Sequence, residues 1–118
     1  MIAREKKWVF PLLLRNGKAQ ALSGSSLPLG TNPDGKYEES TVPLQGGDAL
    51  FFFTDGITEA KNEKGELFGF DRMEVAVRNL SPMLTAKEMV EAMLHEVQSF
   101  VGPARQHDDL TLVVCRVL

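Results

Sequence analysis

The chain has 118 residues, of which 43% are hydrophobic and 25% charged, and its net charge is -3. This size and composition fit one soluble globular domain with a single core. The weak negative charge and the lack of a basic patch exclude a nucleic-acid-binding surface, so we expect no nucleic acid partner.

The cysteine content and the hydropathy pattern indicate the compartment. Cys115 is the only cysteine, which excludes an intramolecular disulfide and favours a reducing compartment. It lies in an apolar run, so we expect it to be a small core residue. The apolar patch at residues 8–14 contains Pro11 and is too short for a signal peptide or a membrane span. We therefore expect a cytoplasmic protein with no membrane contact.

The beginning of the chain is expected to form a hairpin. Residues 1–8 are charged and expected to be frayed, whereas residues 9–118 are expected to form one domain. Residues 9–15 are predicted to be a strand. Pro11 cannot donate to a ladder, so this strand or its beginning should lie at a sheet edge. Asn16-Gly17 separates it from residues 18–22, and Asn-Gly between two apolar runs is a strong hairpin signal.

Two more strands are predicted before the middle of the chain. Residues 37–44 are typical of a half-exposed strand. Residues 50–53 are four consecutive large apolar residues, which predicts a central strand covered on both faces. Asp55-Gly56 follows almost directly. A carboxylate on such a rigid support suits metal binding or catalysis, although Asp-Gly is also a common turn after a core strand.

Two helices are expected next. Asp71 is predicted to be a helix N-cap with Glu74 three residues later, and Thr85 and Glu88 form a second predicted capping box. Gly102-Pro103 should end the second helix. Apolar residues at helical spacing predict the packed faces. These residues are Met73, Ala76, Val77 and Leu80 in the first helix, and Met89, Val90, Met93, Leu94, Val97, Phe100 and Val101 in the second.

The last apolar stretch, residues 110–117, is predicted to be another inner strand. Asp108 and Asp109 stand at its entrance and should point in opposite directions, so at most one of them can share a site with Asp55. A solvated Asp-Asp turn is the alternative. If the two apolar strands are antiparallel neighbours, Asp55 and one member of the pair come together. Oxygen-only ligands suit Mg²⁺ or Mn²⁺.

Three groups of residues resemble, in order and spacing, the later motifs of SpoIIE-type phosphatases. These enzymes are bacterial members of the metal-dependent PPM protein serine/threonine phosphatases. The three groups are Phe52-Phe53-Thr54-Asp55-Gly56-Ile57-Thr58-Glu59-Ala60, Gly65-Glu66-Leu67-Phe68-Gly69 and Gln106-His107-Asp108-Asp109-Leu110-Thr111. Residues 11–17 and 28–30 are also similar to the segment that precedes these motifs in the family. The resemblance covers nearly the whole chain from about Val9.

The resemblance implies an α+β fold, a partial α-β-β-α sandwich with a mainly antiparallel sheet and two helices packed on one face. It also implies a Mn²⁺ or Mg²⁺ centre with Asp55 and Asp108 as ligands. Residues expected to support the site or the local structure are Thr54, Gly56, Glu59 and Asp109. The implied reaction is attack of a metal-activated water on phosphoserine or phosphothreonine of a protein. Typical substrates in the family are phosphorylated antagonists of anti-sigma factors.

The resemblance extends only to the later half of the family's domain. The early acidic motif with its metal-bridging aspartate has no counterpart, and Trp8-Val9-Phe10 stands where a Gly-His pair is expected. No catalytic nucleophile or base is assigned. Two functions are considered: a phosphatase domain that another chain or segment must complete, and a catalytically inactive interaction or dimerisation module. A third, an unrelated small α+β binding protein, is less favoured because several motifs match in order.

Three properties are expected for this chain: weak metal binding, slow or absent hydrolysis of a phosphate ester, and a homodimer in which the sheets of two chains pack face to face or join edge to edge. The alternative to the dimer is that the hairpin of residues 9–22 folds over and closes the sheet within one chain.

Overall fold

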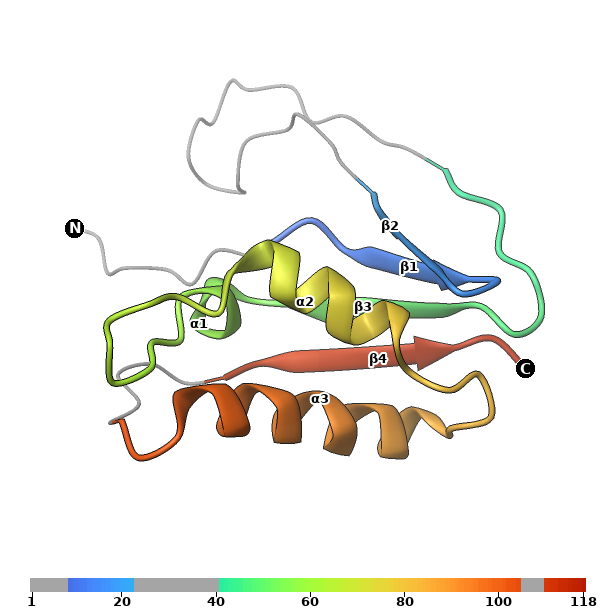
Figure 1. The fold of residues 1–118 in the computed structure, drawn as a ribbon. Coiled ribbons are helices and arrows are strands. Elements are labelled where there is room, and N and C mark those ends of the chain that lie inside the picture. Colours follow the sequence, from blue (N-terminus) through green and yellow to red (C-terminus); the bar gives the residue numbers. More distant parts are fainter. Residues whose placement is uncertain (1–8, 23–40, 105–109) are drawn as a thin grey trace, which may run out of the picture.

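The computed structural model describes residues 9–22, 41–104 and 110–118. Within these ranges, strands β1 (Leu12–Arg15), β2 (Lys18–Ala21), β3 (Ala49–Phe53) and β4 (Leu112–Arg116) form one antiparallel sheet in the order β2-β1-β3-β4. The helices are α1 (Asp55–Thr58), α2 (Gly69–Arg78) and α3 (Ala86–Val101). Figure 1 shows α3 running alongside β4, with α2 in front of the sheet. The expected α+β class is confirmed.

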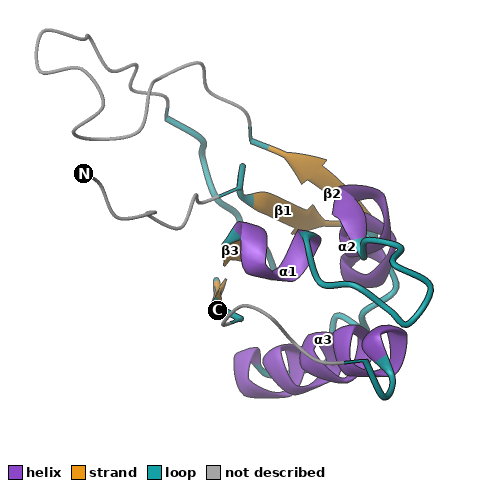
Figure 2. Ribbon diagram, turned by 90° about the vertical axis from the view of Figure 1, so that its left-hand side faces the viewer, coloured by secondary structure: helices purple, strands orange, loops and turns teal. Residues whose placement is uncertain are grey.

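The helices and the sheet form two layers with the core between them. In Figure 2, α2 and α3 lie on the same side of the strands, as expected for two helices packed on one face. Alternate residues of β1 and β3 point into this core, which also contains most of the predicted face of each long helix. Val90 and Leu94, predicted for the packed face of α3, are partly exposed and lie outside this core. The buried core residues are Leu12, Leu14, Ala49, Phe51, Phe53, Ile57, Ala60, Phe68, Met73, Val77, Met89, Met93 and Val97.

The hairpin prediction is confirmed, but its place in the sheet differs. Asn16 and Gly17 have φ of 51° and 73°, the two positive values that a type I′ turn requires. β1 pairs with β2 on one side and with β3 on the other, so β1 is an inner strand. Pro11 does not prevent this because it lies just outside β1. The hairpin therefore extends the sheet sideways, and the alternative in which it folds over the free face is wrong.

The sequence predicts that β4 is an inner strand and that β3 is covered on both faces, and the structure differs from this on both points. Along β3, buried residues alternate with the partly exposed Leu50 and Phe52, so the face away from the helices is not fully covered. Among the described strands, β4 has only β3 as a neighbour and lies at the edge of the sheet. Cys115 is opposite Leu50 on the face without helices, so it is exposed and not a core residue.

Of the predicted strand at residues 37–44, only residues 41–44 are described, and they are exposed and form no strand. In this segment the carbonyl of Pro43 accepts a hydrogen bond from the Arg15 side chain, 2.8 Å away, instead of a ladder hydrogen bond.

The two helix starts were predicted with unequal success. α2 begins at Gly69 with Phe68 as N-cap, so Asp71 is not the cap and lies in the first turn, where a negative charge favours the helix dipole. The capping box of α3 is confirmed: Glu88 N donates to Thr85 Oγ1 at 3.1 Å, and Thr85 N donates to Glu88 Oε1 at 2.9 Å. Gly102 follows the last residue of α3 with φ of 59°. None of these helices has the length and apolar character needed to span a membrane.

Candidate metal centre

Asp55 lies where the central strand β3 turns into helix α1. Thr54 keeps an extended backbone and is the N-cap of α1, and Asp55 is its first residue. The short helix is held against the core by Ile57, which is 1% exposed. The carbonyl of Asp55 accepts from Glu59 N at 2.8 Å and from Thr58 Oγ1 at 3.3 Å. Asp55 is partly exposed, and no hydrogen bond to its carboxylate is found among the described residues.

The start of β4 lies beside Asp55. Phe53 pairs with Leu112 in the antiparallel ladder, and Thr54 N donates to the carbonyl of Thr111 at 3.3 Å. The condition on which the sequence argument depended, that the two apolar strands are antiparallel neighbours, is therefore met. Asp108 and Asp109 lie outside the described residues.

The residues expected to support the site lie in the same turn. Thr54 is 2% exposed, Gly56 is buried, and Glu59 is an exposed residue that follows the last residue of α1. The Thr54 hydroxyl is buried, and its Oγ1 has no hydrogen-bond partner in residues 9–22, 41–104 and 110–118. A buried polar atom without a partner is costly and uncommon in native structures. The turn thus contains two oxygen groups, one carboxylate and one hydroxyl, whose bonding capacity is not used within the described chain.

The Asp55 carboxylate and the Thr54 hydroxyl can be compared with the ligands that the metal implied by the sequence prefers. Carboxylate and hydroxyl oxygens are hard ligands, which suit Mg²⁺ or Mn²⁺ better than softer ions. Across residues 9–22, 41–104 and 110–118, no group of three or more His, Cys, Asp or Glu side chains could hold a metal ion. Asp55 therefore fits the ion by its chemistry and needs a further carboxylate.

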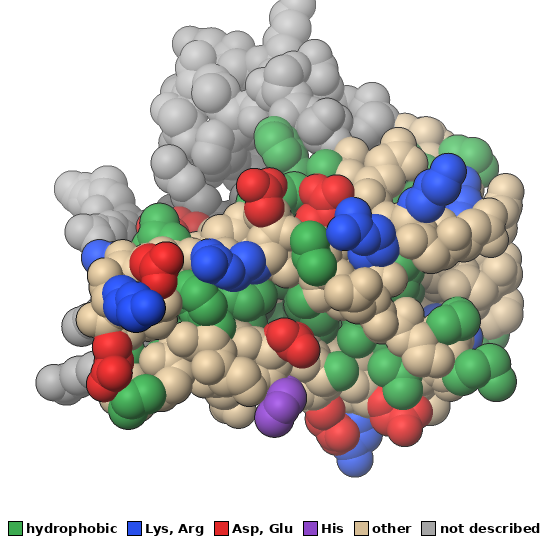
Figure 3. Space-filling model, in the orientation of Figure 1, with side chains coloured by type: hydrophobic (Ala, Val, Ile, Leu, Met, Phe, Trp, Pro, Cys, Tyr) green, Lys and Arg blue, Asp and Glu red, His purple; other side chains and the backbone are tan. Residues whose placement is uncertain are grey.

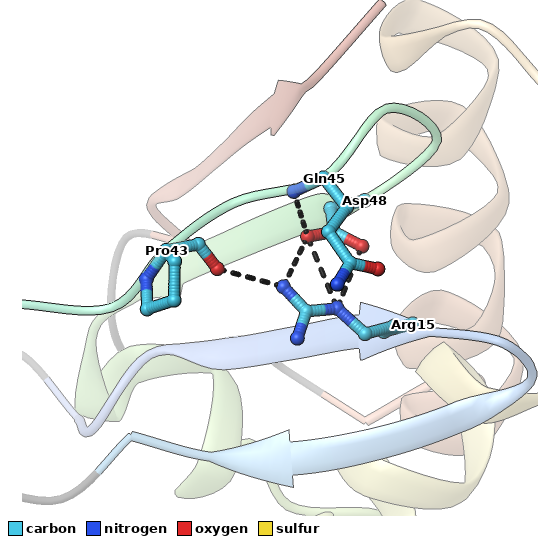
Figure 4. A network of polar contacts seen from close by, with 4 residues as sticks. All are labelled: Arg15, Pro43, Gln45 and Asp48. Carbon is cyan, nitrogen blue, oxygen red and sulfur yellow. Dashed lines mark hydrogen bonds and ion pairs between the residues drawn. The ribbon is translucent and has the colours of Figure 1, made fainter.

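A polar cluster at the opposite end of the sheet was not predicted from the sequence. Asp48 is 1% exposed and precedes β3, whereas Arg15 ends β1 (Figure 4). Arg15 Nε donates to Asp48 Oδ1 at 3.0 Å, Arg15 Nη2 donates to Oδ2 at 2.6 Å, and Gln45 N donates to Oδ2 at 2.7 Å. The Arg15 hydrogen bonds, and then that from Gln45 N, lower the pKa of Asp48. This cluster fastens the segment before β3 to the hairpin.

A groove between α2 and α3 was also not predicted. It has a volume of about 570 Å³ and opens on the side of the molecule away from the sheet, where Figure 3 shows hydrophobic side chains between charged ones. The Arg72 guanidinium lies over the Phe100 ring, 4.5 Å from its centroid. Asp55 does not line the groove. The residues that line the groove are Phe68, Asp71, Arg72, Val75, Ala76, Asn79, Leu80, Ala92, Glu96, Ser99 and Phe100.

The antiparallel sheet, the helix pair on one face and the acidic turn at the end of β3 define part of a PPM-type phosphatase domain. The chain belongs to the SpoIIE family, because the sequence profile described as "Stage II sporulation protein E (SpoIIE)" matches residues 9–118. The family expected from the motifs is confirmed.

Named relatives agree with this assignment. The chain is 33% identical to "Phosphoserine phosphatase RsbU" of Bacillus subtilis (strain 168), over 80% of this chain and 28% of RsbU. The "SiaA-PP2C domain of Pseudomonas aeruginosa" superimposes with a TM-score of 0.76 at 28% identity, over 93% of this chain and 43% of that one. A Bacillus subtilis SpoIIE structure superimposes with a TM-score of 0.73 at 26% identity, and it contains the PP2C phosphatase domain and a fragment of the regulatory domain. It is matched over 92% of this chain and 31% of its own length. The chain thus spans less than half the length of each of these proteins.

Proposed function

We propose that this chain forms part of a metal-dependent phosphatase that hydrolyses phosphoserine or phosphothreonine on a protein. The observation that carries the proposal is the position of Asp55, which lies at the end of β3, beside the start of β4, with no described partner for its carboxylate. The family match over residues 9–118 and the likeness to a phosphoserine phosphatase support the same function. They favour it over a non-catalytic interaction module.

Asp55 and Asp108 are the proposed ligands of Mn²⁺ or Mg²⁺. When bound, such an ion activates water for attack on phosphorus and neutralises the charge that develops there. The protein's part is to hold the ligands: β3 and the buried Ile57 fix the backbone of Asp55, and the β3–β4 pairing fixes the strand that follows Asp108. Thr54, Gly56, Glu59 and Asp109 are proposed to support this arrangement. Two carboxylates and waters make an incomplete cage, so the affinity should be low.

The proposed substrate is a phosphorylated protein, such as the antagonist of an anti-sigma factor, as the family resemblance implies. A cytoplasmic location and a homodimer belong to the same proposal. The single cysteine supports the reducing compartment, and the partly uncovered face of the sheet supports the dimer.

Calorimetric titration with Mn²⁺ tests the metal ligand. Asp55→Asn should weaken Mn²⁺ binding by at least about tenfold, because removal of a ligand costs no less than removal of the groups that support it. Asp71→Asn is the matched control, since Asp71 is an exposed carboxylate in the first turn of α2 and should bind as the parent does. Equal Mn²⁺ uptake by Asp55→Asn and the parent chain would remove Asp55 from the site.

A further inference from the structure

The Thr54 side chain lies at a helix N-cap position but forms no cap hydrogen bond. It is the N-cap residue of α1, where a threonine hydroxyl commonly accepts a hydrogen bond from the backbone of the first turn. In this chain the cap hydrogen bond is absent, although the backbone of Thr54 has the extended conformation of a cap, with φ of -99° and ψ of 168°. The hydroxyl is therefore directed elsewhere.

No residue that the structure describes forms a hydrogen bond with the Thr54 hydroxyl. Thr54 is 2% exposed, and its Oγ1 has no hydrogen-bond partner among these residues. The neighbouring carboxylate of Asp55 does not serve as one. Valine has almost the same shape as threonine and has no hydroxyl to satisfy, so a purely structural role for this position would favour valine. A threonine here makes sense if its hydroxyl bonds to a group that arrives with a ligand.

The position of the hydroxyl indicates which ligand. Phe53 points into the core, and strand side chains alternate, so the Thr54 side chain leaves β3 on the face away from the helices. It directly precedes the proposed metal ligand Asp55, and its own backbone N–H donates a hydrogen bond to the carbonyl of Thr111, the residue before β4. Thr54 thus lies at the β3–β4 joint, where the cation would be held.

We infer that Thr54 is a positioning residue of the metal centre, whose hydroxyl donates a hydrogen bond to a water ligand of the bound Mn²⁺ or Mg²⁺. This inference rests on the proposed function. Hard cations held by few carboxylates keep several waters, and groups that orient such ligands affect metal affinity strongly. Without the ion, the buried hydroxyl lacks a hydrogen bond and destabilises the fold; with the ion bound, it forms a hydrogen bond to a water ligand.

Two variants of the full chain separate this role from packing. Thr54→Val removes the hydroxyl and keeps the shape, so we expect a melting temperature raised by roughly 4 °C without metal and Mn²⁺ binding weakened by about tenfold. Thr54→Ser keeps the hydroxyl and removes a buried methyl group, so it should melt lower than the parent and bind Mn²⁺ as the parent does. Thermal unfolding in chelator and calorimetric titration with Mn²⁺ measure the two effects.

The outcomes distinguish the inference from the function on which it rests. Parental Mn²⁺ affinity in Thr54→Val, with Asp55→Asn still impaired, would overturn the role of Thr54 and leave the metal centre intact. An equal loss of affinity in Thr54→Ser and Thr54→Val would assign the effect to packing and also overturn it. Equal Mn²⁺ affinity of Asp55→Asn and the parent would overturn both the role of Thr54 and the proposed metal centre. A higher melting temperature with weaker Mn²⁺ binding in Thr54→Val, and parental Mn²⁺ affinity in Thr54→Ser, would establish the role of Thr54.

Discussion

At the scale of single residues, the Arg15–Asp48 pair shows how a buried charge is kept in this fold. Asp48 is almost fully enclosed, and the Arg15 side chain, 29% exposed, binds its carboxylate through both Nε and Nη2. Arg15 also donates to the carbonyl of Pro43. One guanidinium thereby joins the end of β1 to the segment at Pro43 and to Asp48, the residue directly before β3. Replacement of either partner would leave the other charge without its main contact.

The Asp48 pair predicts a loss of stability in acid. The pKa of Asp48 lies below its ordinary value of 3.8, chiefly because of the Arg15 hydrogen bonds. The folded state therefore releases this proton more readily than the unfolded state does. The resulting stabilisation is complete above the ordinary pKa and is lost as the pH falls through the lower, folded value. Asp48→Asn should be less stable than the parent at about pH 7, and the difference should shrink below about pH 4.

Urea denaturation over this pH range measures the effect. Glu88, whose pKa is also lowered by its hydrogen bonds with Thr85, is present in both proteins and cancels in the comparison. A difference in free energy of unfolding that stays constant from neutral to strongly acidic pH would show that the charge of Asp48 does not contribute.

Sequence reasoning singles out Asp55 as a candidate ligand and misses the Arg15–Asp48 pair for a physical reason. Asp55 follows an unbroken apolar run, and the run itself shows that the carboxylate is on a rigid strand. Asp48 follows a Gly-Gly turn, and its partner Arg15 is 33 positions away. No local pattern joins the two residues; only the β1–β3 pairing brings them together.

At the scale of elements, α3 is the part of the chain that its own sequence specifies most fully. It has both members of a capping box, a continuous apolar stripe and a glycine directly after its last residue. Local signals of this kind can be read without knowledge of the fold. α2 has a clear apolar face and no side-chain cap, so its face was predicted and its first residue was not. The faces of β3 and the edge position of β4 depend on neighbours that the sequence does not reveal.

The capping box of α3 gives a prediction on stability. Thr85→Ala removes the hydroxyl that accepts from Glu88 N, and should lower the free energy of unfolding by about 1 kcal/mol. The matched control is Ser99→Ala, which changes an exposed hydroxyl within the same helix and should not destabilise the chain. Urea denaturation of the three proteins provides the comparison. Equal stability of Thr85→Ala and the parent would mean that the cap contributes nothing measurable.

At the scale of the whole molecule, the two faces of the sheet are unequal. Helices cover one face, whereas the other has Leu50 and Phe52 partly exposed, Val113 45% exposed and Cys115 exposed. β4 also has a free edge among the described strands. Exposed apolar surface and open strand edges commonly mark interfaces.

This asymmetry predicts a homodimer formed through the face without helices, since two-fold dimers are the commonest homo-oligomers. Val113→Asp should dissociate it, because it places an unpaired charge in the interface. Val75→Asp is the matched control: Val75 is 42% exposed, but lies on α2 on the other side of the molecule. Sedimentation equilibrium at micromolar concentration should show a dimer for the parent and for Val75→Asp. A monomeric parent, or a dimer that survives Val113→Asp, would contradict this interface.

The strand order also has a consequence for the speed of folding. The β1–β2 hairpin closes through a tight turn, and α3 forms from local contacts, so both can appear within microseconds. β3 is different: Phe51 pairs with Leu12 on one side and with Val114 on the other, and both partners are remote in the chain. Closing such long loops before any contact is gained makes these pairings slow. The slowest step in folding should therefore be the joining of β4 to β3, which is also the step that brings the segment after Asp108 to Asp55.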